Sequence, residues 1–247
     1  MTGYIDAAEG GKLDAILVAH GAPADPVSQD AAMARLALQV AARLPGWDIR
    51  GATLAMEGSL ARAVAAMDAP LIYPFFMAEG WFTRTLLPQR LVDAGGTDLK
   101  ILRPFGANPA LPELMIRAAR DGAAGAGLVP SQTTLLIAAH GSQVARSSAE
   151  MTEDLARIMR ERAGFARVVT GFVEEAPFLQ EAACGIGPAL CLPLFALSAG
   201  HVTGDVPEAL AAACFTGPIL PPVGAMPEVP DIIAATLQGV LNAEGSR

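Results

Sequence analysis

The chain has 247 residues, of which 52% are hydrophobic and 17% are charged, and its formal net charge is −8. This length and composition are enough for a large buried core, in one large domain or two small ones. The acidic balance argues against nucleic acid as a main partner. The longest apolar stretch, GIGPALCLPLFALSAGHV, is interrupted by prolines and glycines, and the first residues lack the pattern of a secretory signal. We therefore expect a cytoplasmic protein with no membrane span.

Apolar runs rich in β-forming residues alternate with helical patterns along the first half of the chain. Between the first two runs, apolar residues recur at three- and four-residue steps over residues 33–44, which predicts an amphipathic helix. Alternation of strands and helices at this spacing is typical of βαβ units and hence of a parallel sheet. The predicted strands of this half span residues 15–19, 49–55, 71–76 and 99–105.

The same order of elements begins again after a glycine-rich boundary at residues 121–132. ILVAHGAP aligns with LIAAHGSQ, and YPFFMAEGW aligns with LPLFALSAGH. The sequence therefore predicts an internal duplication and an α/β fold with two pseudo-symmetric lobes, each a parallel sheet flanked by helices, over residues 1–125 and 126–247. The predicted strands of the second half span residues 134–139, 167–173, 189–195 and 218–220.

The histidines of the chain, His20, His140 and His201, all lie in loops at the ends of predicted strands. Ligands of open α/β sheets bind at the carboxyl ends of the strands, where neighbouring loops are close together. We therefore expect His140 and His201 to converge on one metal ion or one proton. In the alignment Trp81 takes the place of His201, so the N-terminal half is a degenerate repeat, and a contribution from His20 stays open.

Carboxylates accompany these histidines. Glu174 and Glu175 close the second predicted strand of the second half, and Glu57 lies at the matching place in the first half. Imidazole together with carboxylate suits divalent first-row metals such as cobalt, nickel, zinc or iron. The alternative for each glutamate is a solvated position at the start of a helix, and the choice among the three stays open.

Other motifs argue against competing chemistries. The chain contains no GxxxxGK[ST], no GxSxG and no CxxC pattern, which argues against nucleotide hydrolases, α/β-hydrolases and zinc ribbons. The cysteines, Cys184, Cys191 and Cys214, are expected to be small buried apolar side chains in a reducing cytoplasm. Asp205, two residues before a proline, is interpreted as a helix cap.

Three motifs together resemble the CbiX/SirB-type sirohydrochlorin chelatases of the class II chelatase family. They are HGSQ after an apolar strand, VEEAPF at a strand end, and PLFALSAGHVTGDVP. The resemblance implies a lyase that inserts a divalent metal, its substrate, into a tetrapyrrole without ATP or any other nucleotide. His140, His201 and Glu174 would then bind the metal and accept the pyrrole protons. We expect cobalt insertion into sirohydrochlorin in cobalamin biosynthesis; the alternatives are iron or nickel insertion, or a non-catalytic metal or tetrapyrrole carrier.

The resemblance also assigns residues to the tetrapyrrole. It implies a cleft between the lobes, in which Trp81 offers a flat ring for stacking. Arg84 and Arg146 would lie near the mouth of this cleft and contact the carboxylates of the macrocycle. Ordinary packing for Trp81 and solvated charges for the arginines are the alternatives. A fused duplication removes the need for a dimer, so a monomer and a homodimer are both compatible with the sequence.

Overall fold

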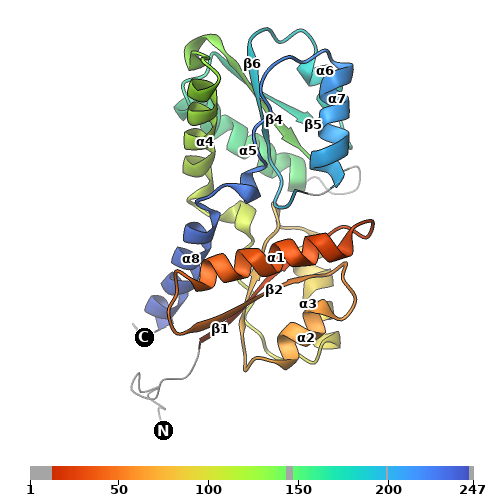
Figure 1. Ribbon diagram of the computed structural model, residues 1–247, viewed down its shortest axis with the longest axis vertical. Coiled ribbons are helices and arrows are strands. Elements are labelled where there is room, and N and C mark those ends of the chain that lie inside the picture. The colour runs from red at the N-terminus through yellow and green to blue at the C-terminus, as the bar shows by residue number, and fades with distance from the viewer. Residues whose placement is uncertain (1–12, 143–146, 199, 245–247) are drawn as a thin grey trace.

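The computed structural model describes residues 13–142, 147–198 and 200–244, and two parallel sheets form its framework (Figure 1). The first sheet has the strand order β2-β1-β3, and the second has the order β5-β4-β6. This confirms the predicted α/β fold with two lobes. The strands are β1 (Leu13–Ala19), β2 (Trp47–Thr53), β3 (Leu71–Pro74), β4 (Thr134–Ala139), β5 (Arg167–Phe172) and β6 (Ala189–Pro193).

The central strand of each sheet is buried on both faces. Residues 15–19 and 135–139 are each 2% exposed or less. A parallel strand covered by helices on both sides needs a continuous apolar run, and ILVA and LLIAA supply it. These runs explain why strands at the centre of each half are predictable from the sequence.

The predicted fourth strand of each half does not form. Residues 99–105 and 218–220 contribute single bridges instead, Ile101 to Ile72 and Ile219 to Cys191. Each segment contains a proline, Pro104 and Pro218, and proline has no N–H to donate to a sheet. The strand prediction is therefore wrong for these two segments, although each still runs beside the third strand of its half.

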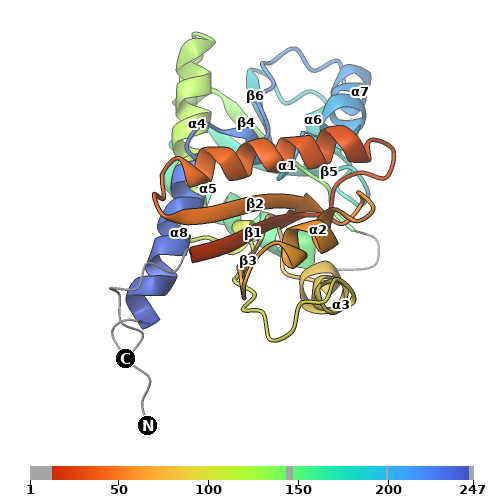
Figure 2. The same ribbon diagram turned by 60° about the horizontal axis from the view of Figure 1, so that its bottom comes forward.

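Helices cover both faces of the first sheet. Figure 2 shows α1 (Pro26–Ala41) lying across this sheet, and α8 (Val229–Glu244) packs beside α1 on the same face. On the other face, α2 (Ser59–Ala65) and α3 (Leu87–Asp93) form a separate apolar cluster with the strands. The sheet is therefore the middle layer of three.

The second sheet has the same layers. On one face lie α4 (Leu111–Gly125) and α5 (Ser147–Arg162), and on the other α6 (Leu179–Ala183) and α7 (Val206–Ala212). The short helices are η1 (Phe82–Leu86), η2 (Phe105–Ala107), η3 (Pro130–Gln132), η4 (His201–Asp205) and η5 (Val223–Ala225). No helix in the described ranges is long and apolar enough to cross a membrane.

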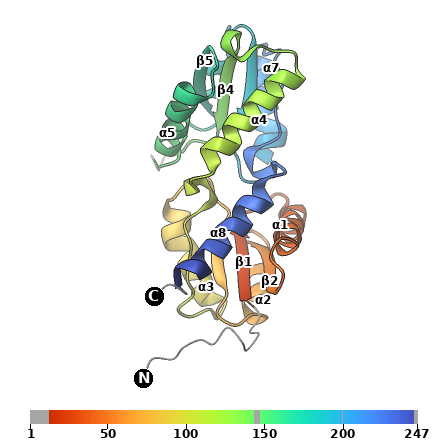
Figure 3. The ribbon, with the colours of Figure 1, turned by 90° about the vertical axis from the view of Figure 1, so that its left-hand side faces the viewer.

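The two halves of the sequence exchange their last helices (Figure 3). Helix α4 belongs to the first half but packs against α5 and β6, where Glu113 pairs with Arg162 at 2.7 Å. Helix α8 belongs to the second half but packs against α1, where Asp231 pairs with Arg43 at 2.5 Å. We therefore propose lobes with exchanged end helices in place of a division between residues 125 and 126.

The cysteines differ in burial. Cys191 is buried in β6, and burial raises the pKa of its thiol to about 12. Cys184 and Cys214 are exposed, so the prediction of three buried cysteines is wrong for these two. Cys184 directly follows α6, and Cys214 lies two residues after the end of α7.

A glycine close to another backbone holds the loop after the third strand of each half. A Cβ on Gly224 would lie 1.9 Å from the carbonyl oxygen of Ala196, and one on Gly106 would lie 1.5 Å from that of Met77. The amide of Gly224 donates to the carbonyl of Phe195 at 2.9 Å, which closes the contact. The loop after β6 therefore depends on the absence of a side chain at residue 224.

We predict that Gly224→Ala lowers the free energy of unfolding by about 2–4 kcal/mol, because two backbone segments must separate. Gly239→Ala is the control: this helical glycine is exposed and a Cβ there meets nothing within 4 Å. It should raise stability by about 0.5–1 kcal/mol through helix propensity. Urea unfolding measures both changes, and equal stability of the two variants would contradict the prediction.

Candidate metal centre

Three side chains from three different strand ends meet at the carboxyl edge of the second sheet. His140 directly follows β4, Glu174 lies two residues after β5, and His201 is the first residue of η4, after β6. One ligand atom from each lies within 4.8 Å of the others. Because β4 is the central strand between β5 and β6, the three loops have to be neighbours at this edge.

Hydrogen bonds determine which nitrogen of each imidazole carries a hydrogen. The Nδ1 of His140 lies 2.9 Å from the carbonyl oxygen of Gly141, and the Nδ1 of His201 lies 2.5 Å from a carboxylate oxygen of Asp205. Both partners accept hydrogen bonds, so each Nδ1 is the donor. In the neutral rings the Nε2 atoms then carry lone pairs, and these two atoms are 3.0 Å apart.

Two lone pairs at this distance repel each other unless a cation lies between them. A proton satisfies the pair, and so does a divalent metal, for which both nitrogens are ready as ligands. Metal–nitrogen bonds of about 2.0–2.1 Å in a tetrahedral site require the nitrogens to be roughly 3.3 Å apart. A small opening of the pair is therefore enough to admit the metal.

The two neighbouring glutamates, Glu174 and Glu175, make different contacts. An oxygen of Glu174 lies 3.8 Å from the Nε2 of His140. The carboxylate of Glu175 instead accepts a hydrogen bond from the amide of Ser142 at 2.7 Å, which holds the loop after His140. The open choice between the two glutamates therefore goes to Glu174 on geometry.

The group is accessible from solvent. The side chains of His140, Glu174 and His201 are 38%, 45% and 40% exposed. A metal ion can therefore reach all three side chains together with a large second ligand.

Asp205 orients His201, which the sequence interpretation as a helix cap missed. Asp205 is the residue before α7, but its side chain makes no capping hydrogen bond. Its carboxylate accepts the Nδ1 hydrogen of His201 from four residues along the chain, within the π-helical turn η4. A carboxylate behind a metal-binding imidazole fixes the tautomer and the orientation of the ring. The signal available in the sequence was the spacing H-x₃-D.

The first half has the same backbone with a different side chain at the glutamate position. The amide of Ala55 donates to the carbonyl of His20 at 2.9 Å, as that of Glu174 donates to His140 at 3.0 Å. Ala55 is therefore the counterpart of Glu174, and the assignment of Glu57 to that place is wrong. Glu57 lies two residues farther along, in a turn, and is exposed.

Phe82, and not Trp81, is the counterpart of His201. Phe82 begins the π-helical turn η1 as His201 begins η4. Its ring lies 4.5 Å from that of His20 at an interplanar angle of 78°, and the rings of His201 and His140 are 4.3 Å apart at 80°. The predicted replacement of the second histidine by Trp81 is wrong by one residue, because residues 73–82, YPFFMAEGWF, match residues 192–201, LPLFALSAGH, without a gap.

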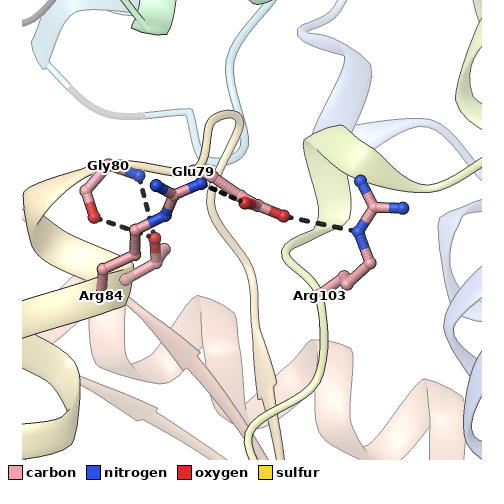
Figure 4. A network of polar contacts seen from close by, with 5 residues as sticks. Glu79, Gly80, Arg84 and Arg103 are labelled. Carbon is pink, nitrogen blue, oxygen red and sulfur yellow. Dashed lines mark hydrogen bonds and ion pairs between the residues drawn. The ribbon is translucent and has the colours of Figure 1, made fainter.

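Two of the three residues predicted to contact the tetrapyrrole lie at or beside η1. Trp81 is 58% exposed beside η1, and its ring is 5.2 Å from that of Phe82. Arg84 lies in η1 and pairs with Glu79 at 2.8 Å (Figure 4). Arg146 lies outside the described residues. The structure therefore places Trp81 and Arg84 together at the carboxyl edge of the first sheet.

The chain is similar to known proteins in sequence and in structure. The CbiX family model matches residues 134–239. A solved structure described as CbiX, the terminal enzyme for biosynthesis of siroheme in denitrifying bacteria, has 46% sequence identity and a TM-score of 0.85, over 92% of this chain and 98% of that chain. The chain belongs to the CbiX family. This confirms the resemblance found in the sequence and identifies the chain as a member of a chelatase family.

Two more distant structures share the fold with this CbiX family member. SirB from Bacillus subtilis with Fe³⁺ has a TM-score of 0.75 at 14% identity, over 95% of this chain and 98% of that chain. The multi-domain protein DR2241 from Deinococcus radiodurans, which has structural similarity to chelatases, has a TM-score of 0.69 at 23% identity, over 91% of this chain and 55% of that chain. A search of curated proteins found no match.

We predict that Asp205→Ala weakens Co²⁺ binding about 10- to 100-fold, because His201 loses the partner that fixes its tautomer. Calorimetric titration without tetrapyrrole measures the affinity. Glu208→Ala is the matched control, since it removes the same charge from an exposed position on α7. Equal affinities in the two variants would exclude the orienting role of Asp205.

The first half should be convertible into a second metal centre. His20 already has its Nδ1 on the carbonyl of Gly21 at 2.9 Å, which matches His140. We predict that Ala55→Glu combined with Phe82→His lets the protein bind a second equivalent of Co²⁺ in the same titration. Unchanged stoichiometry in a folded double variant would mean that the two halves are not equivalent at this site.

Proposed function

We propose that this protein inserts a divalent metal into sirohydrochlorin or a closely related tetrapyrrole. The observation that carries the proposal is the convergence of two imidazole Nε2 atoms at 3.0 Å with Glu174 beside them. Membership in the CbiX family supports the reaction class. No nucleotide is required in this scheme, because metal binding and proton removal supply the chemistry.

The geometry accounts for metal delivery and for removal of the pyrrole protons. A metal that enters a tetrapyrrole replaces the pyrrole N–H protons, so a group nearby has to accept them. Each Nε2 of the pair can bind the metal first and take a proton once the metal has passed to the macrocycle. Glu174, 3.8 Å from His140 and 45% exposed, can pass such a proton to solvent. His140, Glu174 and His201 are therefore the proposed metal-binding and catalytic residues.

Iron and cobalt are the two metals that we favour. The relative with 46% identity is described as a siroheme enzyme, which favours iron. Cobalt, the metal expected from the sequence, fits the same imidazole and carboxylate ligands, and nickel does as well. We propose iron insertion as the first candidate and cobalt insertion, in corrinoid synthesis, as the second.

The test is an anaerobic absorbance assay with purified protein, sirohydrochlorin and Fe²⁺, Co²⁺ or Ni²⁺ in turn. We expect His140→Ala to lower the single-turnover insertion rate about 100-fold or more, because it removes a ligand and a proton acceptor. His20→Ala should retain most of the rate, since Ala55 and Phe82 leave His20 without ligand partners.

Two results would contradict the proposal. Wild-type protein that binds both metal and tetrapyrrole without accelerating insertion would be a carrier and not a chelatase. Equal losses in His20→Ala and His140→Ala would mean that the first half takes part in the chemistry directly.

A further inference from the structure

Two arginines flank one carboxylate at the carboxyl edge of the first sheet. Glu79 pairs with Arg84 at 2.8 Å through one oxygen and with Arg103 at 3.4 Å through the other. Figure 4 shows the two guanidinium groups on opposite sides of Glu79, with the terminal nitrogens of Arg103 pointing away from it. The three side chains together carry a net positive charge in a chain whose total is −8.

Stability does not explain this cluster. The side chains of Arg84 and Arg103 are 73% and 77% exposed, and exposed ion pairs contribute about 0–1 kcal/mol at most. Bringing two guanidinium groups to one carboxylate also sets like charges near each other. Hydrogen bonds from Arg84 first, and then Arg103, lower the pKa of Glu79, so its carboxylate stays ionised and holds both groups. The cluster therefore presents two positioned cations to solvent.

Exposed aromatic rings accompany these cations. Trp81 directly precedes η1, which carries Arg84, and Trp81 and Phe82 are 58% and 40% exposed. Guanidinium groups bind carboxylates through paired N–H donors, and indole and phenyl rings stack on flat conjugated systems. A ligand that satisfies all four side chains is flat, conjugated and bears carboxylates at its rim.

The edges of the two sheets meet in space. Gln29, near the start of α1, donates from its Nε2 to the carbonyl of Ser198 at 3.2 Å. Ser198 lies in the loop between β6 and η4, which carries His201. The arginine cluster follows β3 and the bridge at Ile101, so it lies at the first of these two edges.

The duplication shows that this cluster belongs to one half only. The amides of Phe75 and Leu194 donate to equivalent residues of the central strands, so Phe75 and Leu194 are counterparts. Four residues farther along, Ser198 is therefore the counterpart of Glu79. Thr203 and Pro221 likewise take the places of Arg84 and Arg103. The second half therefore lacks the charges of the cluster, as the first half lacks the metal-binding side chains.

We propose that Arg84 and Arg103 form a carboxylate-binding subsite for the rim of the tetrapyrrole, with Glu79 as the residue that positions them. The macrocycle stacks near Trp81 and Phe82 on the first lobe while its centre faces the histidine pair of the second. The proposal rests on the proposed function, and it adds Arg103 and Glu79 to the residues expected from the sequence. In this proposal the first half binds the rim of the substrate, and the second half carries out the metal and proton chemistry.

The test measures binding of metal-free sirohydrochlorin by absorbance titration. Arg84→Ala and Arg103→Ala should each weaken binding about 10- to 100-fold, the value of a charged hydrogen bond to a carboxylate. Arg103→Lys should recover part of the affinity, because it restores charge without the paired donors. The double variant should also show a weaker dependence of affinity on KCl than wild type.

Two controls separate this role from a general effect. Arg157→Ala removes an exposed arginine whose pair with Asp154 lies on α5, and it should leave binding unchanged. Co²⁺ affinity without tetrapyrrole should be unchanged in all of these variants, because they leave the histidine pair intact.

Wild-type affinity for sirohydrochlorin in the Arg84→Ala/Arg103→Ala double variant would overturn the subsite and leave the proposed function standing. Absence of sirohydrochlorin binding by wild-type protein that still binds Co²⁺ would overturn both. Equal weakening by Arg157→Ala would also overturn the subsite, since overall charge would then account for the effect.

Discussion

The repulsion between two imidazole lone pairs is the constraint on which the centre depends. His140 and His201 each commit Nδ1 to an acceptor, which leaves both Nε2 atoms facing each other at 3.0 Å. A cation between the two nitrogens relieves this repulsion, and a proton and a metal ion would compete for the same place. The surrounding structure keeps the pair together: the parallel strands set the spacing of the loops, and Gly224 lets the loop after β6 pack against backbone.

The duplication explains why one chain holds two unequal copies of the same arrangement. Under the proposed function a single macrocycle needs one set of metal ligands, so the other copy is free to change. His20 keeps its contact with Gly21, but Ala55 and Phe82 take the places that Glu174 and His201 have in the second half. In exchange, the first half carries the charged side chains Arg84 and Arg103, for which the second half has no counterpart. Helix α4 of the first half packs against α5 and β6 of the second, and α8 of the second half packs against α1 of the first, so each half supports the other.

The errors of the sequence alignment have a physical origin. The paired histidines His20 and His140 are 120 positions apart, but Phe82 and His201 are 119 apart, so the copies differ by a residue before the third strand. Glycine and threonine recur at the same spacing in GWFT, residues 80–83, and GHVT, residues 200–203, and this recurrence predicts Trp81 as the counterpart of His201. Main-chain hydrogen bonds, which no sequence displays, identify Phe82 and Ala55 as the counterparts. A one-residue shift of this kind changes which side chain faces the site.

The sequence by itself determined three strands of each half, the duplication and the expectation that His140 and His201 converge, because apolar runs, repeated motifs and the positions of the histidines can be read directly from it. It also limited the carboxylate to a few glutamates. Only the tertiary structure decided that Glu174 reaches the imidazoles while Glu175 holds the Ser142 amide, and that Asp205 orients a ligand. It alone brought Arg103 to Glu79 across 24 positions of chain. Each of these depends on directions and distances between side chains on separate loops, which the packing of strands and helices sets and the order of residues does not.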